Sequence, residues 1–104
     1  MYARVTSFPG LAPERITATL AEFEQQQLPV LEKQDGFRGV WAGVDRNAGR
    51  AMAVTFWETL EDLRASDKLA AQVKAVAVAT SRADREPITD RYEVVLQREV
   101  SLPK

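Results

Sequence analysis

The spacing of hydrophobic residues divides the chain into strands and helices in a recognisable order. Short apolar runs bounded by turn formers indicate strands, and Ile16, Leu20 and Phe23 recur at helical spacing. The expected elements are strands at 2–8, 37–44, 50–57 and 88–100, a helical unit from about 13 to 34 and a helical region from 59 to 80. The order strand–helix–strand–strand–helix–strand predicts a ferredoxin-like α+β subunit with an antiparallel sheet.

Three local signals predict where the helical segments break and end. Pro29 has no N–H to donate, so it should kink or interrupt the first helical unit. Gly36 suits the left-handed position that closes this unit. In the second helical region the apolar stripe loses phase near Ser66 and Asp67, which are good cap residues. We therefore expect two shorter helices that meet there.

Both faces of the predicted third strand are uncharged. Met52, Val54 and Phe56 point to one side of it, and the residues between them point to the other. A sheet with one face in water normally alternates apolar and polar residues, and large apolar faces are rarely left exposed. We therefore expect a homodimer that packs through its sheet faces, most simply with two-fold symmetry. The alternative is a single chain with a solvated apolar face.

Small residues on this strand predict an apolar pocket. If Trp57 faces the helices, then Ala51, Ala53 and Thr55 share its face and leave space above it. Such a surface suits a small-molecule site, with Phe23 of the first helix as a further wall. The alternative is a filled core, made by large apolar residues of the helices: Ile16, Leu20, Phe23 and Leu69.

Composition narrows the chemistry that is available. The 104 residues carry a formal charge of −1 and contain neither cysteine nor histidine. We expect one domain over 1–104, without disulfides, thiolate or imidazole catalysis, or a metal site. The near-neutral charge disfavours nucleic-acid partners, and the longest apolar run, 75–79, is too short to cross a membrane. A cytoplasmic location is expected.

Carboxylates and tyrosines remain as candidates for acid–base work. Tyr2 and Tyr92 can donate a hydrogen bond to an oxyanion, and Glu58, Asp62 and Asp67 can act as bases if burial raises their pKa. The alternative is structural, because hydroxyls usually have a structural partner and carboxylates at helix starts are usually solvated.

Four stretches carry a family resemblance. They are DGFRG at 35–39, VTFWET at 54–59, LEDLRAS at 60–66 and YEVVL at 92–96. Together with the element order, which covers nearly the whole chain, they resemble the antibiotic biosynthesis monooxygenase (ABM) family. The resemblance implies a dimeric α+β barrel in which two subunits pack sheet to sheet, each with a pocket between its sheet and its helices.

The resemblance also separates two kinds of chemistry. Haem-degrading members use an Asn in the first strand, a Trp at the end of the third and a His in the following helical region. Only the Trp is retained, as Trp57; the first strand offers Thr6 and Ser7, and Ser66 or Asp67 stands where the His would be. Haem degradation is therefore disfavoured.

The cofactor-independent oxygenases of the family need fewer protein groups, because the substrate itself supplies the electrons. The resemblance implies a small phenolic substrate, with catalytic roles for Trp57 as an aromatic or hydrogen-bonding contact, Tyr92 as an oxyanion donor and Asp67 as a base. Tyr2 is the alternative oxyanion donor, and Glu58 is the alternative base. The substrate-binding residues would be four: Phe23, Ala51, Ala53 and Thr55. The alternative is a non-catalytic module of the same fold that binds a small ligand or takes part in assembly.

Overall fold

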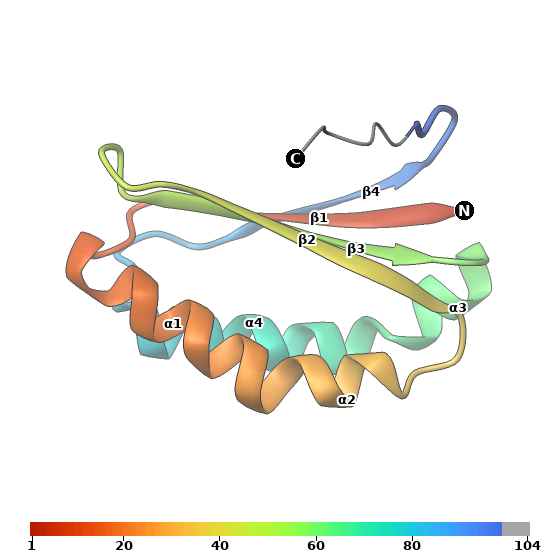
Figure 1. Ribbon diagram of the computed structural model, residues 1–104, viewed down its shortest axis with the longest axis horizontal. Coiled ribbons are helices and arrows are strands. Elements are labelled where there is room, and N and C mark those ends of the chain that lie inside the picture. The colour runs from red at the N-terminus through yellow and green to blue at the C-terminus, as the bar shows by residue number, and fades with distance from the viewer. Residues whose placement is uncertain (99–104) are drawn as a thin grey trace, which may run out of the picture.

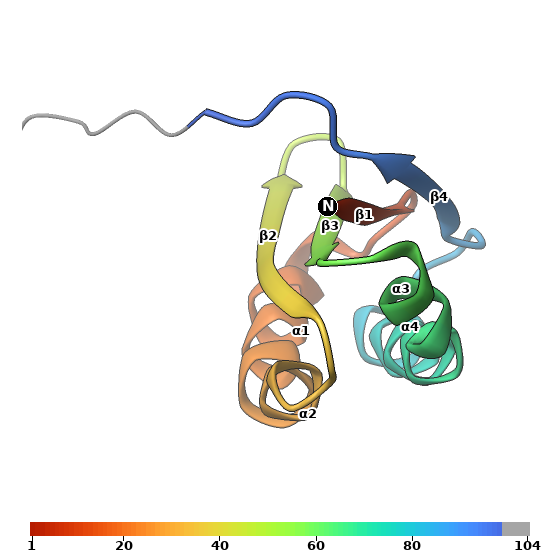
Figure 2. The same ribbon diagram turned by 90° about the vertical axis from the view of Figure 1, so that its right-hand side faces the viewer.

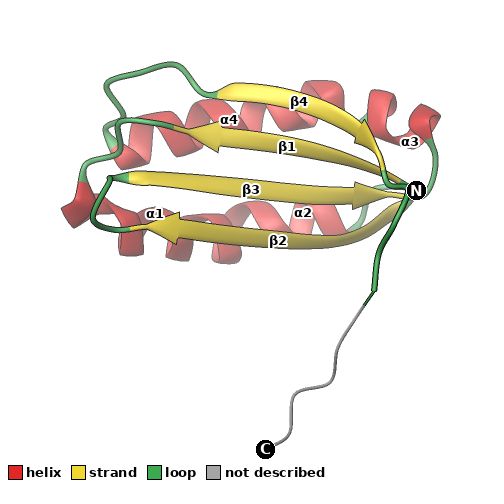
Figure 3. Ribbon diagram, turned by 90° about the horizontal axis from the view of Figure 1, so that it is seen from above, coloured by secondary structure: helices red, strands yellow, loops and turns green. Residues whose placement is uncertain are grey.

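Four antiparallel strands form one sheet in a computed structural model that describes residues 1–98. The strand order is β2-β3-β1-β4, so the first strand lies inside the sheet and the last lies at an edge (Figure 3). The strands are β1 (Tyr2–Phe8), β2 (Phe37–Asp45), β3 (Arg50–Trp57) and β4 (Ile88–Glu93). The predicted ferredoxin-like α+β subunit is confirmed.

The helices of the described residues all cover one face of this sheet (Figure 1). They form two rows, with α1 and α2 in one row and α3 and α4 in the other (Figure 2). Their bounds are α1 (Ile16–Glu22), α2 (Leu28–Glu32), α3 (Leu60–Ala65) and α4 (Asp67–Ser81). A 3₁₀ turn, η1 (Pro13–Arg15), precedes α1, and a π-helical turn, η2 (Phe23–Gln27), joins α1 to α2. The other face of the sheet carries no helix of the described residues.

The predicted helix breaks are confirmed. Ahead of Pro29 the chain widens into the π-helical turn, a form of interruption that the sequence does not specify. Gly36 has the expected left-handed backbone, with φ at +76°. Thr59 caps α3 by accepting a hydrogen bond from the Asp62 N–H at 3.0 Å, and the two shorter helices meet at Ser66.

The strand register confirms which face of the sheet looks at the helices. Trp57 pairs with Tyr2, and Thr55 pairs with Arg4, so these four side chains share one face. Trp57 is fully buried there. On the outer face lie Met52, opposite Ser7, and its neighbours in adjacent strands.

The prediction of a final strand over 88–100 is wrong in length. β4 ends at Glu93, residues 94–98 are not in a strand, and Val100 lies outside the described residues. The reason is the partner strand: β1 pairs with β4 only as far as Tyr2 opposite Glu93, and one further hydrogen bond follows, from the Val94 N–H to the Met1 carbonyl.

The densest packing lies at the end of the sheet where β3 stops. Leu31, Trp57 and Leu63 are buried together, and four partly buried residues pack on them: Tyr2, Phe23, Phe37 and Leu69. The rings of Phe37 and Trp57 meet edge to face, with centroids 5.5 Å apart. No helix among residues 1–98 combines the length and the apolar character of a membrane span.

Candidate functional site

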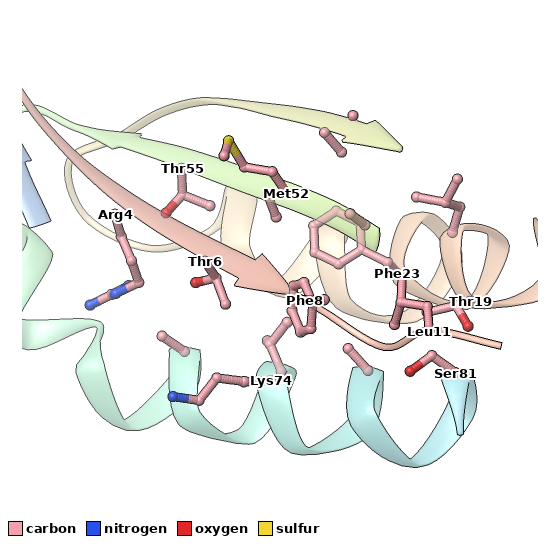
Figure 4. A pocket seen from close by; sticks show the side chains of 18 of the residues that line it. Arg4, Thr6, Phe8, Leu11, Thr19, Phe23, Met52, Thr55, Lys74 and Ser81 are labelled. Atoms are coloured by element: carbon pink, nitrogen blue, oxygen red, sulfur yellow. The ribbon is translucent and has the colours of Figure 1, made fainter. Parts of the chain in front are cut away.

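An apolar cavity of about 110 Å³ lies between the sheet and the helices, beside the packed core (Figure 4). Its walls come from β1 and β3 on one side and from α1, η2 and α4 on the other. Short side chains face each other across it, Ala51 and Ala53 from the sheet and Ala70 and Ala77 from α4. Because the two alanines of α4 are seven residues apart, they share one helix face and leave the space open.

The size of this cavity limits what it can hold. An apolar cavity of about 150 Å³ in another protein is known to hold benzene. The enclosed part therefore has room for about one aromatic ring. A larger ligand has to extend through the open side.

All four predicted substrate-binding residues lie in the lining of this cavity: Phe23, Ala51, Ala53 and Thr55. The sequence allowed either an apolar pocket or a filled core, and each is present in part. Large residues fill the space near Trp57, and small residues leave it empty near Ala51. That these side chains bind a substrate stays a prediction.

Trp57 does not line the cavity, but it is hydrogen-bonded to a residue that does. Its indole Nε1–H donates to the Thr55 hydroxyl at 3.0 Å. An indole can only donate, so Thr55 must accept, and its own O–H proton is left for another acceptor. Thr55 lines the cavity. Thr55 therefore stands in the cavity wall with its hydroxyl oxygen held in place by a buried aromatic residue.

Arg4 is a buried residue of the site that sequence reasoning missed. Its guanidinium donates from Nη1 to the Ser66 hydroxyl at 2.9 Å and from Nη2 to the Leu63 carbonyl at 2.9 Å and to Asp67. It also lies 6.0 Å from the Trp57 ring centroid and lines the cavity. The sequence did contain a signal for Arg4, since the alternation of β1 puts this charged residue on the helix-facing side of the sheet.

Asp67 is an ion-pair acceptor in this arrangement. Its carboxylate accepts hydrogen bonds from Arg4 and, at 3.0 Å, from Arg91. Burial tends to raise the pKa of Asp67, but the hydrogen bonds and charges of Arg91 and Arg4 outweigh it and hold this pKa below its ordinary value. Asp67 is not among the residues that line the cavity. Its predicted role as a base stays a prediction that this geometry does not favour.

The two tyrosines lie away from the cavity. Tyr92 is on the outer face of the sheet with 55% of its surface exposed. The Tyr2 hydroxyl donates to the Glu93 carboxylate at 3.4 Å in an exposed position. Within this single chain neither hydroxyl lines the cavity, so the role predicted for Tyr92 as an oxyanion donor stays a prediction.

The residues that line the cavity do not suit haem. The whole chain lacks histidine and cysteine, which are the usual axial ligands, and neither tyrosine lines the cavity. Over residues 1–98, no three acidic side chains gather in a way that would hold a metal ion.

The outer face of the sheet carries large exposed apolar side chains: Trp41, Met52, Ile88 and Tyr92. The Trp41 ring lies against Gly43, where an added Cβ would come 2.8 Å from the ring atom Cη2. The absence of a side chain at Gly43 thus lets Trp41 lie across its own strand. Trp41, Met52 and Ile88 line one shallow hollow on this face, and Asp90 separates Ile88 from Tyr92 along β4.

Comparison by sequence identifies relatives without a described activity. No family model matches the chain. The uncharacterized Mycobacterium tuberculosis protein Rv2558 is 36% identical over 74 residues, which are 71% of this chain and 31% of that protein. Rv2557 of the same organism is 38% identical over 66 residues, 64% of this chain and 29% of its own length. The matched region thus spans less than a third of these curated relatives.

Comparison by structure gives matches over nearly the whole chain. The monooxygenase from the gene ActVA-Orf6 of Streptomyces coelicolor, solved with the ligand nanaomycin D, superposes with a TM-score of 0.73 at 14% identity, covering 99% of this chain and 92% of that one. An antibiotic biosynthesis monooxygenase gives 0.67 at 12% identity, covering 92% and 100%. The heme-degrader MhuD of Mycobacterium tuberculosis, with two hemes in its active site, gives 0.68 at 21% identity, covering 95% and 100%. At these identities the likeness is one of fold, and the chain has the α+β fold of the antibiotic biosynthesis monooxygenases, as its sequence predicts.

Proposed function

We propose that the chain is a cofactor-independent ABM-like monooxygenase that acts on a small phenolic substrate in the cavity between sheet and helices. One observation carries the proposal: an apolar, ring-sized space in an ABM-like fold, with Thr55 in its wall and the Thr55 hydroxyl oxygen fixed by Trp57. The monooxygenase from Streptomyces coelicolor supports it through the shared fold.

The proposed reaction balances without a reductant other than the substrate. A phenol loses its O–H proton, and the phenolate delivers electrons from its para carbon to O₂ to form a carbon–oxygen bond. The O–O bond then breaks; one oxygen atom becomes the second carbonyl of a quinone and the other leaves as water. The two hydrogens of that water balance the O–H and C–H hydrogens that the substrate loses, and four electrons pass to O₂.

The protein contributes binding and charge stabilisation in this scheme. Thr55 would donate its free hydroxyl proton to the phenolate oxygen as a hydrogen bond, and Trp57 would act as a positioning residue that fixes Thr55. No Asp or Glu lines the cavity among residues 1–98, so the first proton would pass to water. Asp67 and Tyr92 stay predicted participants, to be tested separately.

Oxygen uptake with hydroquinones, catechols and anthrones tests the proposal. We expect O₂ consumption above the uncatalysed rate for at least one of them, with one atom of labelled O₂ in the product. Thr55→Val should lower the rate by about tenfold to a hundredfold, and Thr6→Val, in the same lining, should change it little. Uptake no faster than autoxidation across the panel would rule the activity out.

A second candidate function is a non-catalytic module that binds a small ligand. It is favoured by the lack of a carboxylate in the described lining and by the ion pairs that hold Asp67. Saturable binding of a ring-sized aromatic compound without any oxygen uptake would identify this function instead.

We further propose that two copies pack through the outer faces of their sheets. The apolar surface of Trp41, Met52, Ile88 and Tyr92 supports this, because surfaces of this kind are rarely left in water. The cavity lies on the opposite side of the sheet, so each copy would keep its own ligand site.

A further inference from the structure

The charged groups of the cavity lining are confined to one end of it. In Figure 4 the nitrogens of Arg4 and Lys74 lie on the same side of the view, away from Leu11 and Ser81. Lys74 of α4 donates from Nζ to the Thr89 hydroxyl at 3.3 Å. Thr89 stands next to Thr6 in the sheet, one inward-facing pair away from Arg4. The remaining lining is almost entirely apolar.

Positive charge exceeds negative charge at this end. Arg4 and Arg91 share one carboxylate, that of Asp67. Lys74 makes no ion pair with a carboxylate in the part of the chain that the structure describes. The carboxylate of Asp67 thus balances one of the three positive charges of Arg4, Arg91 and Lys74. The ammonium of Lys74 has a neutral hydroxyl as its hydrogen-bond partner.

The Arg4 side chain also has one N–H donor beyond those that bind Ser66, Leu63 and Asp67. Its recorded hydrogen bonds all come from Nη1 and Nη2, and they fix the guanidinium against Ser66, Leu63 and Asp67. The Nε–H has no partner among them. A ligand at this end of the cavity would therefore meet an immobile N–H donor from β1 and a longer, adjustable cation from α4.

We propose that this cavity selects aromatic ligands that carry an anionic oxygen group, with the ring in the apolar part and the anion against Lys74 and Arg4. The inference rests on the proposed function in using the same cavity, and it names the substrate class. A half-buried cation beside an apolar space is poorly solvated, and an anionic group would restore its interactions. A neutral ring of the same shape would leave the ammonium without them.

The anionic group can be a carboxylate or a phenolate, and two matched probe pairs separate these sources. The first pair is para-fluorobenzoate and its neutral isostere para-fluorobenzamide. The second is pentafluorophenolate, ionised at neutral pH, and hexafluorobenzene. Fluorine NMR titration gives the dissociation constant of each probe for the wild-type chain, for Lys74→Met, and for Lys68→Met as the control on the exposed side of the same helix.

In at least one pair we expect the wild-type chain to bind the anion about tenfold or more tightly than its neutral partner, as a charge-assisted hydrogen bond allows. Lys74→Met should remove most of this preference, and Lys68→Met should keep it. The pair that shows the preference identifies the anion. Thermal unfolding of each variant checks that it is folded, and the wild-type ratio stands even without the variants.

Equal binding of anion and neutral partner, an unchanged preference in Lys74→Met, or no binding of any probe would each overturn the inference. Oxygen uptake is read separately. Anion preference without turnover would leave this inference standing and remove the proposed monooxygenase. Turnover of a phenol without anion preference would overturn this inference and leave the proposed monooxygenase standing.

Discussion

Thr55 joins the buried core to the cavity. Its hydroxyl oxygen accepts the indole proton of Trp57, whose side chain has no contact with water, and its methyl and hydroxyl form part of the cavity wall. One side chain therefore serves both stability and the proposed chemistry. The two effects can be separated because the free energy of unfolding does not depend on a substrate.

Replacing Thr55 by valine should destabilise the chain without changing its shape. The variant keeps the volume but leaves the buried Trp57 N–H without an acceptor, which costs about 1–3 kcal/mol. Urea unfolding measures this loss. Thr6→Val is the matched control, since Thr6 lines the same cavity and has no recorded hydrogen bond from its hydroxyl. Equal losses in both variants would contradict the assigned role of the Trp57–Thr55 bond.

The ion pairs of Asp67 should make stability depend on acidity. Because its pKa in the folded chain lies below the ordinary 3.8, its contribution is complete above that value and is lost as the pH falls through the folded pKa. Asp67→Asn should be less stable than the wild type at neutral pH, where it leaves Arg4 without its carboxylate. The two unfolding curves should converge below about pH 4. A gap of constant size down to the lowest pH would refute this explanation.

Alternation along the strands was enough to predict which residues line the cavity. It put Ala51, Ala53 and Thr55 on the face of Trp57, and the structure agrees. It did not predict that Trp57 reaches the cavity only through Thr55, because this depends on where the ring turns. Arg4 escaped because its partners Ser66 and Asp67 lie more than sixty residues away along the chain.

At the level of elements, the sequence predicted those features that depend on one or two neighbouring residues. The break at Ser66 and the left-handed Gly36 follow from one or two residues, and they were confirmed, although Ser66 makes no side-chain capping hydrogen bond to α4. The length of β4 was not predicted, because a strand needs a partner and the pairing of β4 with β1 ends at Tyr2 and Glu93. The π-helical turn before Pro29 was likewise not predicted, because a proline indicates an interruption without specifying its form.

The connection from α2 to β2 depends on Gly36. Its positive φ disfavours any side chain, at a cost of about 1–2 kcal/mol, and a Cβ there would lie only 2.6 Å from the Asp62 Cβ. Gly36→Ala should therefore lower the melting temperature. Adding Asp62→Ala removes the carboxyl group, whose Oδ2 would lie 2.1 Å from the new Cβ, but it keeps the Asp62 Cβ, so it should restore only part of the loss. Full stability in the single variant would contradict this account.

The open space between β3 and α4 should tolerate a larger side chain. Ala53→Leu fills part of the cavity with apolar volume, so the melting temperature should stay constant or rise. The same change should abolish the binding of ring-sized probes, measured by fluorine NMR. Val54→Leu, on the opposite face of the strand, is the control and should leave binding intact. Retained binding in Ala53→Leu would place the ligand elsewhere.

On the scale of the whole molecule, the outer sheet face should control self-association. Trp41→Glu puts a charge into the proposed contact, so sedimentation at micromolar concentration should change from two copies to one. Val30→Glu alters another exposed apolar residue, in α2 and away from the outer sheet face, and should remain dimeric. A wild-type chain that sediments as a single copy would refute the dimer.

The contrast between Trp41 and Trp57 gives the molecule two built-in optical reporters. One indole is more than half exposed and the other is sealed in the interior, so their emission maxima and their access to a soluble quencher should differ. Chains carrying a single tryptophan would then follow two events independently. Fluorescence of Trp57 would report the unfolding of the interior, and fluorescence of Trp41 would report the docking of a second copy.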